Sequence, residues 1–169
     1  MKGCVFAGTF DPITVGHQNV IEKCLKAYGK VLVVVGKNPK KTCAFTEKDR
    51  LDWTKRTFKD YTGVEVIAYS QIEGEYADYL KEKGYLIYAR GIRDQKDLEM
   101  ENAYKDINAK IYPFVTTEYV YPDERFATVS SSMVKQKMIL GQDYLEFIPQ
   151  PIRESVKEKA QEVFGAKKI

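Results

Sequence analysis

The chain changes character at Gly8-Thr9-Phe10-Asp11-Pro12-Ile13-Thr14-Val15-Gly16-His17, between a short apolar run at residues 3–7 and a helical pattern at about 15–28. A glycine at the end of the run lets backbone N–H groups come close to a ligand. His17, the only histidine of the chain, falls in the first turn of the helix, where unpaired N–H groups and the helix dipole favour a bound anion. The segment therefore predicts a strand, a phosphate-binding turn and a helix in succession.

The same alternation of apolar runs and helical patterns continues along the chain. Strands are expected at 3–7, 30–35, 64–68, 86–89 and 116–120, with helices at about 15–28, from 46, at 76–83, at about 97–108, from 130–132 and at about 151–163. Alternating strands and helices are typical of stacked βαβ units. No repeat or Pro-, Gly- or Ser-rich linker divides residues 1–169. We therefore predict one α/β domain, a doubly wound parallel sheet with helices on both faces.

Composition narrows the class of protein. The 44% hydrophobic and 30% charged residues are ordinary for a globular domain, and the longest aliphatic run, 31–35, is too short to cross a bilayer. Three cysteines without CxxC spacing argue against a disulfide framework and a zinc site, and they favour the cytoplasm. A net charge of +3 is too weakly basic for a typical nucleic-acid binder, but it suits small anions. We expect neither a nucleic-acid nor a membrane partner.

Three further segments are candidates for anion binding. The second strand leads into the basic segment Lys37-Asn38-Pro39-Lys40-Lys41, and the fourth leads into Arg90-Gly91-Ile92-Arg93. The serines of Ser130-Ser131-Ser132 open a late helix and offer hydroxyl and N–H groups. Taken singly, these are commonly a solvated turn, a surface arginine pair and a helix cap, and His17 is commonly a hydrogen-bonded helix-start residue. In doubly wound folds, however, ligands bind beyond the carboxyl ends of the strands, which favours one shared phosphate site.

Together these segments resemble the nucleotidyltransferases that carry the (H/T)xGH motif. Gly-Thr-Phe-Asp-Pro followed by Thr-x-Gly-His is similar to their first signature, and residues 38–46 are similar to Ser-Pro-x-Lys-x-x-x-Phe. Arg-Gly-Ile-Arg at 90–93 and Val-Ser-Ser-Ser-x-x-Lys at 129–135 resemble the two later signatures, with valine where isoleucine is usual. Thr14 in place of a first histidine is closer to the phosphopantetheine adenylyltransferases than to the nicotinamide mononucleotide branch.

The resemblance implies a Rossmann-like, five-stranded parallel sheet onto which the C-terminal helices from about residue 130 pack. It also implies transfer of the adenylyl group of ATP to 4′-phosphopantetheine, giving 3′-dephospho-coenzyme A and pyrophosphate. Mg²⁺ is carried by ATP, and no residue of the protein is assigned to the metal. His17 and Lys41 are the implied catalytic residues, supported by Arg93, and Lys40 replaces Lys41 if the loop register shifts by one. The implied ATP-binding residues are Thr9, Phe10, His17, Gly91, Ile92, Arg93, Glu101, Phe126, Ala127, Thr128, Val129, Ser130, Ser131 and Ser132. The implied acceptor-binding residues are Thr9, Lys41, Glu73 and Arg90.

The same resemblance implies a cytoplasmic homohexamer in which coenzyme A competes for the site. Two alternatives stay open, which are another adenylyl- or cytidylyltransferase on the same scaffold and a non-catalytic nucleotide sensor. A redox protein is not expected, because the turn after the first strand lacks G-x-G-x-x-G and no CxxC is present.

Overall fold

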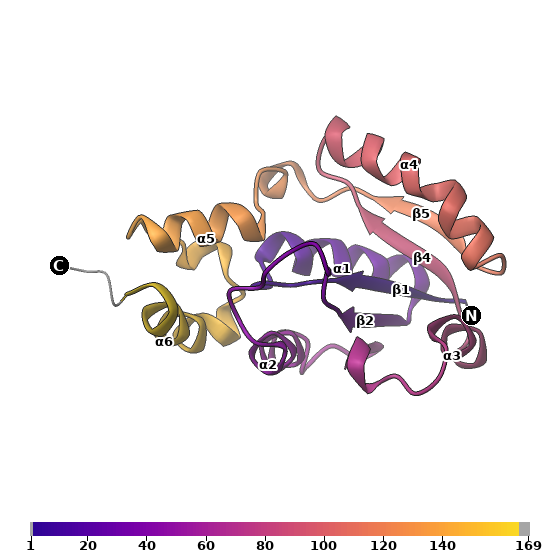
Figure 1. Cartoon of the computed structure of the whole chain (residues 1–169), viewed down its shortest axis with the longest axis horizontal. Helices are drawn as coiled ribbons and strands as arrows, with labels where there is room; N and C mark the ends of the chain where they lie inside the picture. Colours follow the sequence, from indigo (N-terminus) through magenta and orange to yellow (C-terminus); the bar gives the residue numbers. More distant parts are fainter. Residues whose placement is uncertain (1, 166–169) are drawn as a thin grey trace.

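A computed structural model of the chain describes residues 2–165. These residues form a parallel sheet with the strand order β3–β2–β1–β4–β5 (Figure 1). The strands are β1 (Gly3–Gly8), β2 (Val31–Val35), β3 (Val64–Ala68), β4 (Tyr85–Gly91) and β5 (Thr116–Val120). The predicted five-stranded parallel sheet is confirmed, with every strand within two residues of its expected bounds.

Six α-helices connect or cover these strands. They are α1 (Val15–Tyr28), α2 (Glu47–Thr57), α3 (Tyr76–Lys83), α4 (Gln95–Ile111), α5 (Ser131–Ile139) and α6 (Arg153–Phe164), with short 3-10 turns at Tyr69–Gln71, Glu124–Phe126, Leu145–Phe147 and Gln150–Ile152. Figure 1 shows α5 and α6 beyond the carboxyl ends of β1 and β2, at the end of the molecule opposite the N-terminus. Within residues 2–165 no helix has the length and apolar character needed to span a membrane.

The two faces of the sheet carry separate hydrophobic cores, because successive strand side chains point to opposite faces. On one face, Val31, Val33 and Val35 share a core with residues of α1, α2, α5 and α6. On the other, Leu32 and Val34 pack with residues of α3 and the segment after α4. Helices therefore cover both faces, as predicted for a doubly wound sheet, and the C-terminal helices share the first of these cores.

Two of the element boundaries that differ from the sequence prediction bear on the site. Strand β4 continues through Arg90 and Gly91, which were expected to lie in the following loop, because both residues pair with β5. Helix α4 begins at Gln95, two residues earlier than expected, because the side chain of Asp94 caps it by accepting the Asp97 N–H at 2.9 Å. The first difference places Arg90 on a strand end, where its backbone is fixed by the sheet.

Candidate active site

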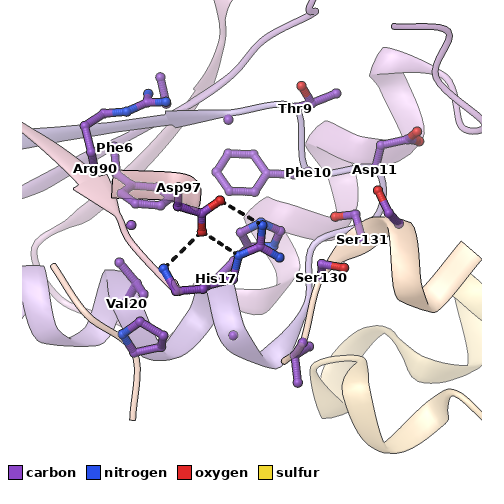
Figure 2. Close-up of a pocket in the computed structure, with 18 of the residues that line it drawn as sticks. Phe6, Thr9, Phe10, Asp11, His17, Val20, Arg90, Asp97, Ser130 and Ser131 are labelled. Atoms are coloured by element: carbon purple, nitrogen blue, oxygen red, sulfur yellow. Dashed lines mark hydrogen bonds and ion pairs between the residues drawn. The ribbon is translucent and has the colours of Figure 1, made fainter. Parts of the chain in front are cut away.

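A cleft of about 340 Å³ opens at the carboxyl ends of β1 and β4 (Figure 2). In the chain β1 is followed by β2, which lies on one side of it in the sheet, whereas β4 is followed by β5, which lies on the other side. The cleft therefore lies where the direction of winding reverses. Ligands of doubly wound folds bind at this switch point. The predicted site residues that line the cleft are Thr9, Phe10, His17, Lys41, Arg90, Gly91, Arg93, Glu101, Phe126, Val129, Ser130, Ser131 and Ser132.

The other four predicted residues lie outside the cleft lining. Ile92 is buried in the protein, and its N–H already donates to the Val120 carbonyl at 2.9 Å. Ala127 and Thr128 lie in the chain between Phe126 and Val129, which both line the cleft. Glu73 is exposed in the segment between β3 and α3. Contacts of these residues with the substrates stay predictions.

His17 is held at the start of α1 by a reciprocal cap with Thr14. The Thr14 N–H donates to His17 Nδ1 at 3.1 Å, and the Thr14 hydroxyl oxygen accepts the His17 N–H at 3.3 Å. Burial of the ring lowers the pKa of His17 to about 4, and the positive charge of Arg93 acts in the same direction. The imidazole is therefore neutral at pH 7. Because Nδ1 accepts a hydrogen bond, the proton resides on Nε2, which makes Nε2 a donor.

Phe10 supports His17 from a backbone conformation that non-glycine residues rarely adopt. Its φ is 51°, and its ring, only 2% exposed, meets the His17 ring edge-on with centroids 5.1 Å apart. A Cβ at position 8 would lie 3.0 Å from Phe10 Cζ, so this close approach requires Gly8. Such strained backbone concentrates at functional sites, where the surrounding structure holds it in place.

The loop after β2 brings Lys41 to the cleft. Lys41 lines it, whereas Lys40 does not, which supports the first of the two registers considered for this loop. A turn holds the segment, since the Asn38 side-chain oxygen accepts the Lys40 N–H at 2.9 Å and the Asn38 carbonyl accepts the Lys41 N–H at 3.0 Å. Lys41 is itself exposed, so its ammonium group is free to follow a ligand.

Two arginines from the end of β4 and the turn after it each hold a carboxylate from α4. Arg90 donates from Nη2 and Nε to the two oxygens of Glu101, at 2.7 and 3.0 Å. Arg93 donates from Nε and from its backbone N–H to Asp97 Oδ2, both at 3.0 Å (Figure 2). These pairs orient the guanidinium planes in the cleft, where each presents its remaining donors to an anion. Glu101 therefore orients Arg90, and its predicted contact with the nucleotide stays a prediction.

The serine run opens α5 on the far wall of the cleft (Figure 2). The Ser130 side chain caps the helix by accepting the Met133 N–H at 3.1 Å, and the Ser131 hydroxyl donates to the Pro12 carbonyl at 2.8 Å. Two of the three hydroxyls thus hold backbone groups, and the contacts of the three serines with ATP stay predictions. The unpaired N–H groups of the first turn remain available to an anion.

Sequence reasoning missed three charged residues of the cleft, which are Asp11, Asp97 and Lys135. Asp11, only 4% exposed, accepts the N–H groups of Ala44 and Phe45 at 2.9 and 3.0 Å and pairs with Lys135 at 2.9 Å. Asp11 is part of the first signature and Lys135 ends the last one, so the motifs contained both. Their pairing joins segments far apart in the sequence, which no local pattern reveals. Within residues 2–165 no group of three His, Cys, Asp or Glu side chains is arranged to hold a metal ion.

The chain is similar to known nucleotidyltransferases over nearly its whole length. The model of the cytidylyltransferase-like family matches residues 5–137. Phosphopantetheine adenylyltransferase of Carboxydothermus hydrogenoformans is 33% identical over 161 residues, which cover 95% of this chain and 98% of that protein. The protein of the same name from Clostridium botulinum strain 657 is 34% identical over 159 residues, covering 94% and 95% of the two chains.

A solved structure from Vibrio parahaemolyticus, assigned to the nicotinate-nucleotide adenylyltransferases, superposes with a TM-score of 0.68. It covers 97% of this chain and 98% of its own, at 17% identity, and therefore supports the Rossmann-like fold alone. The identity and coverage of the two bacterial relatives, together with the family match, place the chain more narrowly. The chain belongs to the phosphopantetheine adenylyltransferases, within the cytidylyltransferase-like family of nucleotidyltransferases.

Proposed function

We propose that this protein transfers the adenylyl group of ATP to 4′-phosphopantetheine, giving 3′-dephospho-coenzyme A and pyrophosphate. The observation that carries the proposal is the convergence of two helix N-termini, α1 and α5, with Lys41, Arg90 and Arg93 on one cleft. N–H groups and cations gathered in this way suit a ligand with several phosphates. Membership in the family supplies the identity of the two substrates.

The acceptor phosphate is the nucleophile, and it needs no base from the protein. A phosphate monoester has a second pKa of about 6, so at neutral pH it is largely a dianion. One of its oxygens attacks the α-phosphorus of ATP, the bond from that phosphorus to the bridging oxygen breaks, and pyrophosphate leaves with the electron pair. The protein contributes positioning and stabilisation of the charge that spreads over the phosphate oxygens.

His17 and Lys41 stabilise this developing charge. His17 donates from Nε2, because its Nδ1 is occupied by the Thr14 N–H. Lys41 contributes an ammonium group from the opposite loop, and Arg93 contributes donors from the turn before α4. ATP enters as its Mg²⁺ complex, so the ion arrives with the substrate. The β- and γ-phosphates lie against the first turn of α5, where the N–H groups of the serine run are free.

The acceptor occupies the part of the cleft that Arg90 and Thr9 line. Arg90 presents a guanidinium plane fixed by Glu101, which suits a terminal phosphate. A contact of the pantetheine arm with Glu73 would require the segment before α3 to approach the cleft. Coenzyme A contains the same pantetheine arm, and we propose that it competes with the acceptor.

The reaction is tested by supplying ATP, Mg²⁺ and 4′-phosphopantetheine and measuring pyrophosphate. We expect release with this acceptor and none with unphosphorylated pantetheine, because the phosphate is the nucleophile. Parallel assays replace ATP with CTP and the acceptor with nicotinamide mononucleotide. Equal turnover with either replacement would move the chain to another branch of the same scaffold, and ATP binding without any turnover would indicate a nucleotide sensor.

We further propose that the enzyme is a cytoplasmic homohexamer. The support for assembly in the structure is α4, which has no buried residue and exposes Met100, Tyr104, Ile107 and Ile111. Three free cysteines suit the reducing cytoplasm, where ATP is also supplied.

A further inference from the structure

A buried arginine lies beneath the loops of the cleft without being part of its wall. Arg50, on α2, is 2% exposed. Its Nη1 donates to the carbonyls of Thr9 and Gly36, both at 2.7 Å, and its Nε donates to the carbonyl of Phe45 at 3.2 Å. Within residues 2–165 no carboxylate lies at ion-pair distance from it. Among the described residues, the hydrogen-bond acceptors of the guanidinium are therefore backbone carbonyls.

Burying an arginine without a carboxylate partner is costly, because the charge leaves water. The hydrogen bonds to the three carbonyls offset that cost, and removing the guanidinium would leave those oxygens without this donor. An apolar side chain could fill the same space, since the nearby residues Phe45 and Trp53 belong to the core. What an apolar residue cannot do is hold three carbonyls from separate segments. The geometry thus indicates a role in placing those segments.

The three carbonyls belong to the segments that carry Thr9 and Lys41. Gly36 directly follows β2, and Phe45 directly precedes the cap of α2, so they are the two ends of the loop that bears Lys41. Thr9 lies in the loop after β1 and lines the cleft. One guanidinium thereby fixes both ends of the Lys41 loop and ties that loop to the neighbouring one. Lys41 is exposed and its turn is held by few bonds, so its position depends on these anchored ends.

We propose that Arg50 is a positioning residue for adenylyl transfer, which keeps the Lys41 loop at the distance from Thr9 and His17 that the reaction requires. This inference rests on the proposed function, since it assigns Arg50 a part in that same reaction. Arg50 touches neither substrate. Arg50 affects the rate through Lys41, because the phosphate of the adenylyl group being transferred between the two loops is stabilised only if both loops are held at the correct separation.

The first test is Arg50→Lys, which keeps the charge but replaces the planar fork with a single ammonium group. We expect kcat to fall roughly ten- to a hundred-fold, in line with the cost of a misplacement of about 1 Å, while KM for ATP changes little. Arg56→Lys is the matched control. Arg56 lies on the same helix and also donates to a backbone carbonyl, that of Pro151, but it is exposed and remote from the cleft lining. Wild-type kcat is expected for this control.

A double-mutant cycle separates positioning from general damage. If Arg50 acts through Lys41, adding Arg50→Lys to Lys41→Ala should lower kcat little further, because the group being positioned is already gone. Multiplication of the two losses would overturn the proposal, since it would mean that Arg50 acts independently of Lys41. Equal kcat for Arg50→Lys and wild type would overturn it as well.

A readout without substrate covers the case in which the lysine variant folds poorly. Arg50→Met retains the volume in an apolar form but leaves the three carbonyls without this donor, so we expect a lower Tm together with a low kcat. Trypsin should cleave at Lys40 or Lys41 faster in this variant than in the wild type or Arg56→Lys. Unchanged cleavage with unchanged kcat would overturn the inference. An inactive wild type in the pyrophosphate assay would instead contradict the proposed function, so the two failures are distinguishable.

Discussion

The single histidine illustrates how one residue is set by elements that are distant in the sequence. Its place at the start of α1 follows from the first signature alone. Its protonation state follows from burial of the ring and from Arg93, which arrives from the turn after β4. Its tautomer follows from the Thr14 N–H. A donor that is neutral and directed by its own helix cap is preorganised for charge that appears only in the transition state.

The protonation state of His17 can be measured directly, because no other histidine contributes a signal. We expect nitrogen NMR of the imidazole to show the neutral form with its proton on Nε2 from pH 8 down to about pH 5.5. With a pKa of about 4, the ring gains its second proton only as the pH falls towards that value. In urea the same ring should titrate near 6.5, the ordinary value for histidine. A midpoint between 6 and 7 in the folded protein would contradict the neutral donor.

Removal of the imidazole should affect the rate more than the binding of ATP. In His17→Ala we expect kcat to fall roughly a hundred- to a thousand-fold, as when one preorganised donor is lost from other enzymes. KM for ATP should rise much less, because the contact strengthens on the way to the transition state. His17→Asn, which retains a side-chain donor, should recover part of the rate. A steep rise in KM with nearly normal kcat would show that His17 holds only the ground state.

At the scale of elements, most strands were predictable because they are short runs rich in apolar residues between glycines or polar turns. The buried run Val31–Val35 is the clearest case, since every one of its residues is buried. The end of β4 was not predictable in the same way. Arg90 and Gly91 do not resemble strand residues, and they extend the strand only because β5 pairs with them. Tertiary pairing overrides the local preference at this position.

The residues of the candidate site also differ in how far they could be predicted from the sequence. Most of its candidate phosphate-binding residues lie at strand ends and helix starts, and both are local signals that a sequence carries. Asp97 orients Arg93 from only four residues away, but two other carboxylates are not local, since Glu101 reaches Arg90 from the second turn of α4 and Asp11 reaches Lys135 across the cleft. The role of Arg50 is harder still to predict from sequence, because its partners are backbone carbonyls, which every residue type carries.

At the scale of the whole molecule, α4 is a helix without a core of its own. Met100, Tyr104, Ile107 and Ile111 are each about half exposed, and they recur at intervals of four, three and four residues. Such intervals place them on one face of the helix, where they form an apolar stripe. Soluble monomers rarely leave a contiguous apolar stripe of this kind in water, and a second copy of the chain is the partner that a homo-oligomer offers.

The apolar stripe on α4 gives the assembly a direct test. Light scattering of the wild-type protein should give a mass near six times the 19.4 kDa of one chain. The double variant Tyr104→Glu, Ile107→Glu places two charges on the stripe and should lower the mass, because a buried unpaired carboxylate is costly at an interface. Asp106→Lys changes the charge of the same exposed helix roughly 100° away from Ile107 and should leave the mass unchanged. A wild-type protein that stays monomeric at full activity would contradict the hexamer. An unchanged mass for the double variant would mean that another surface joins the chains.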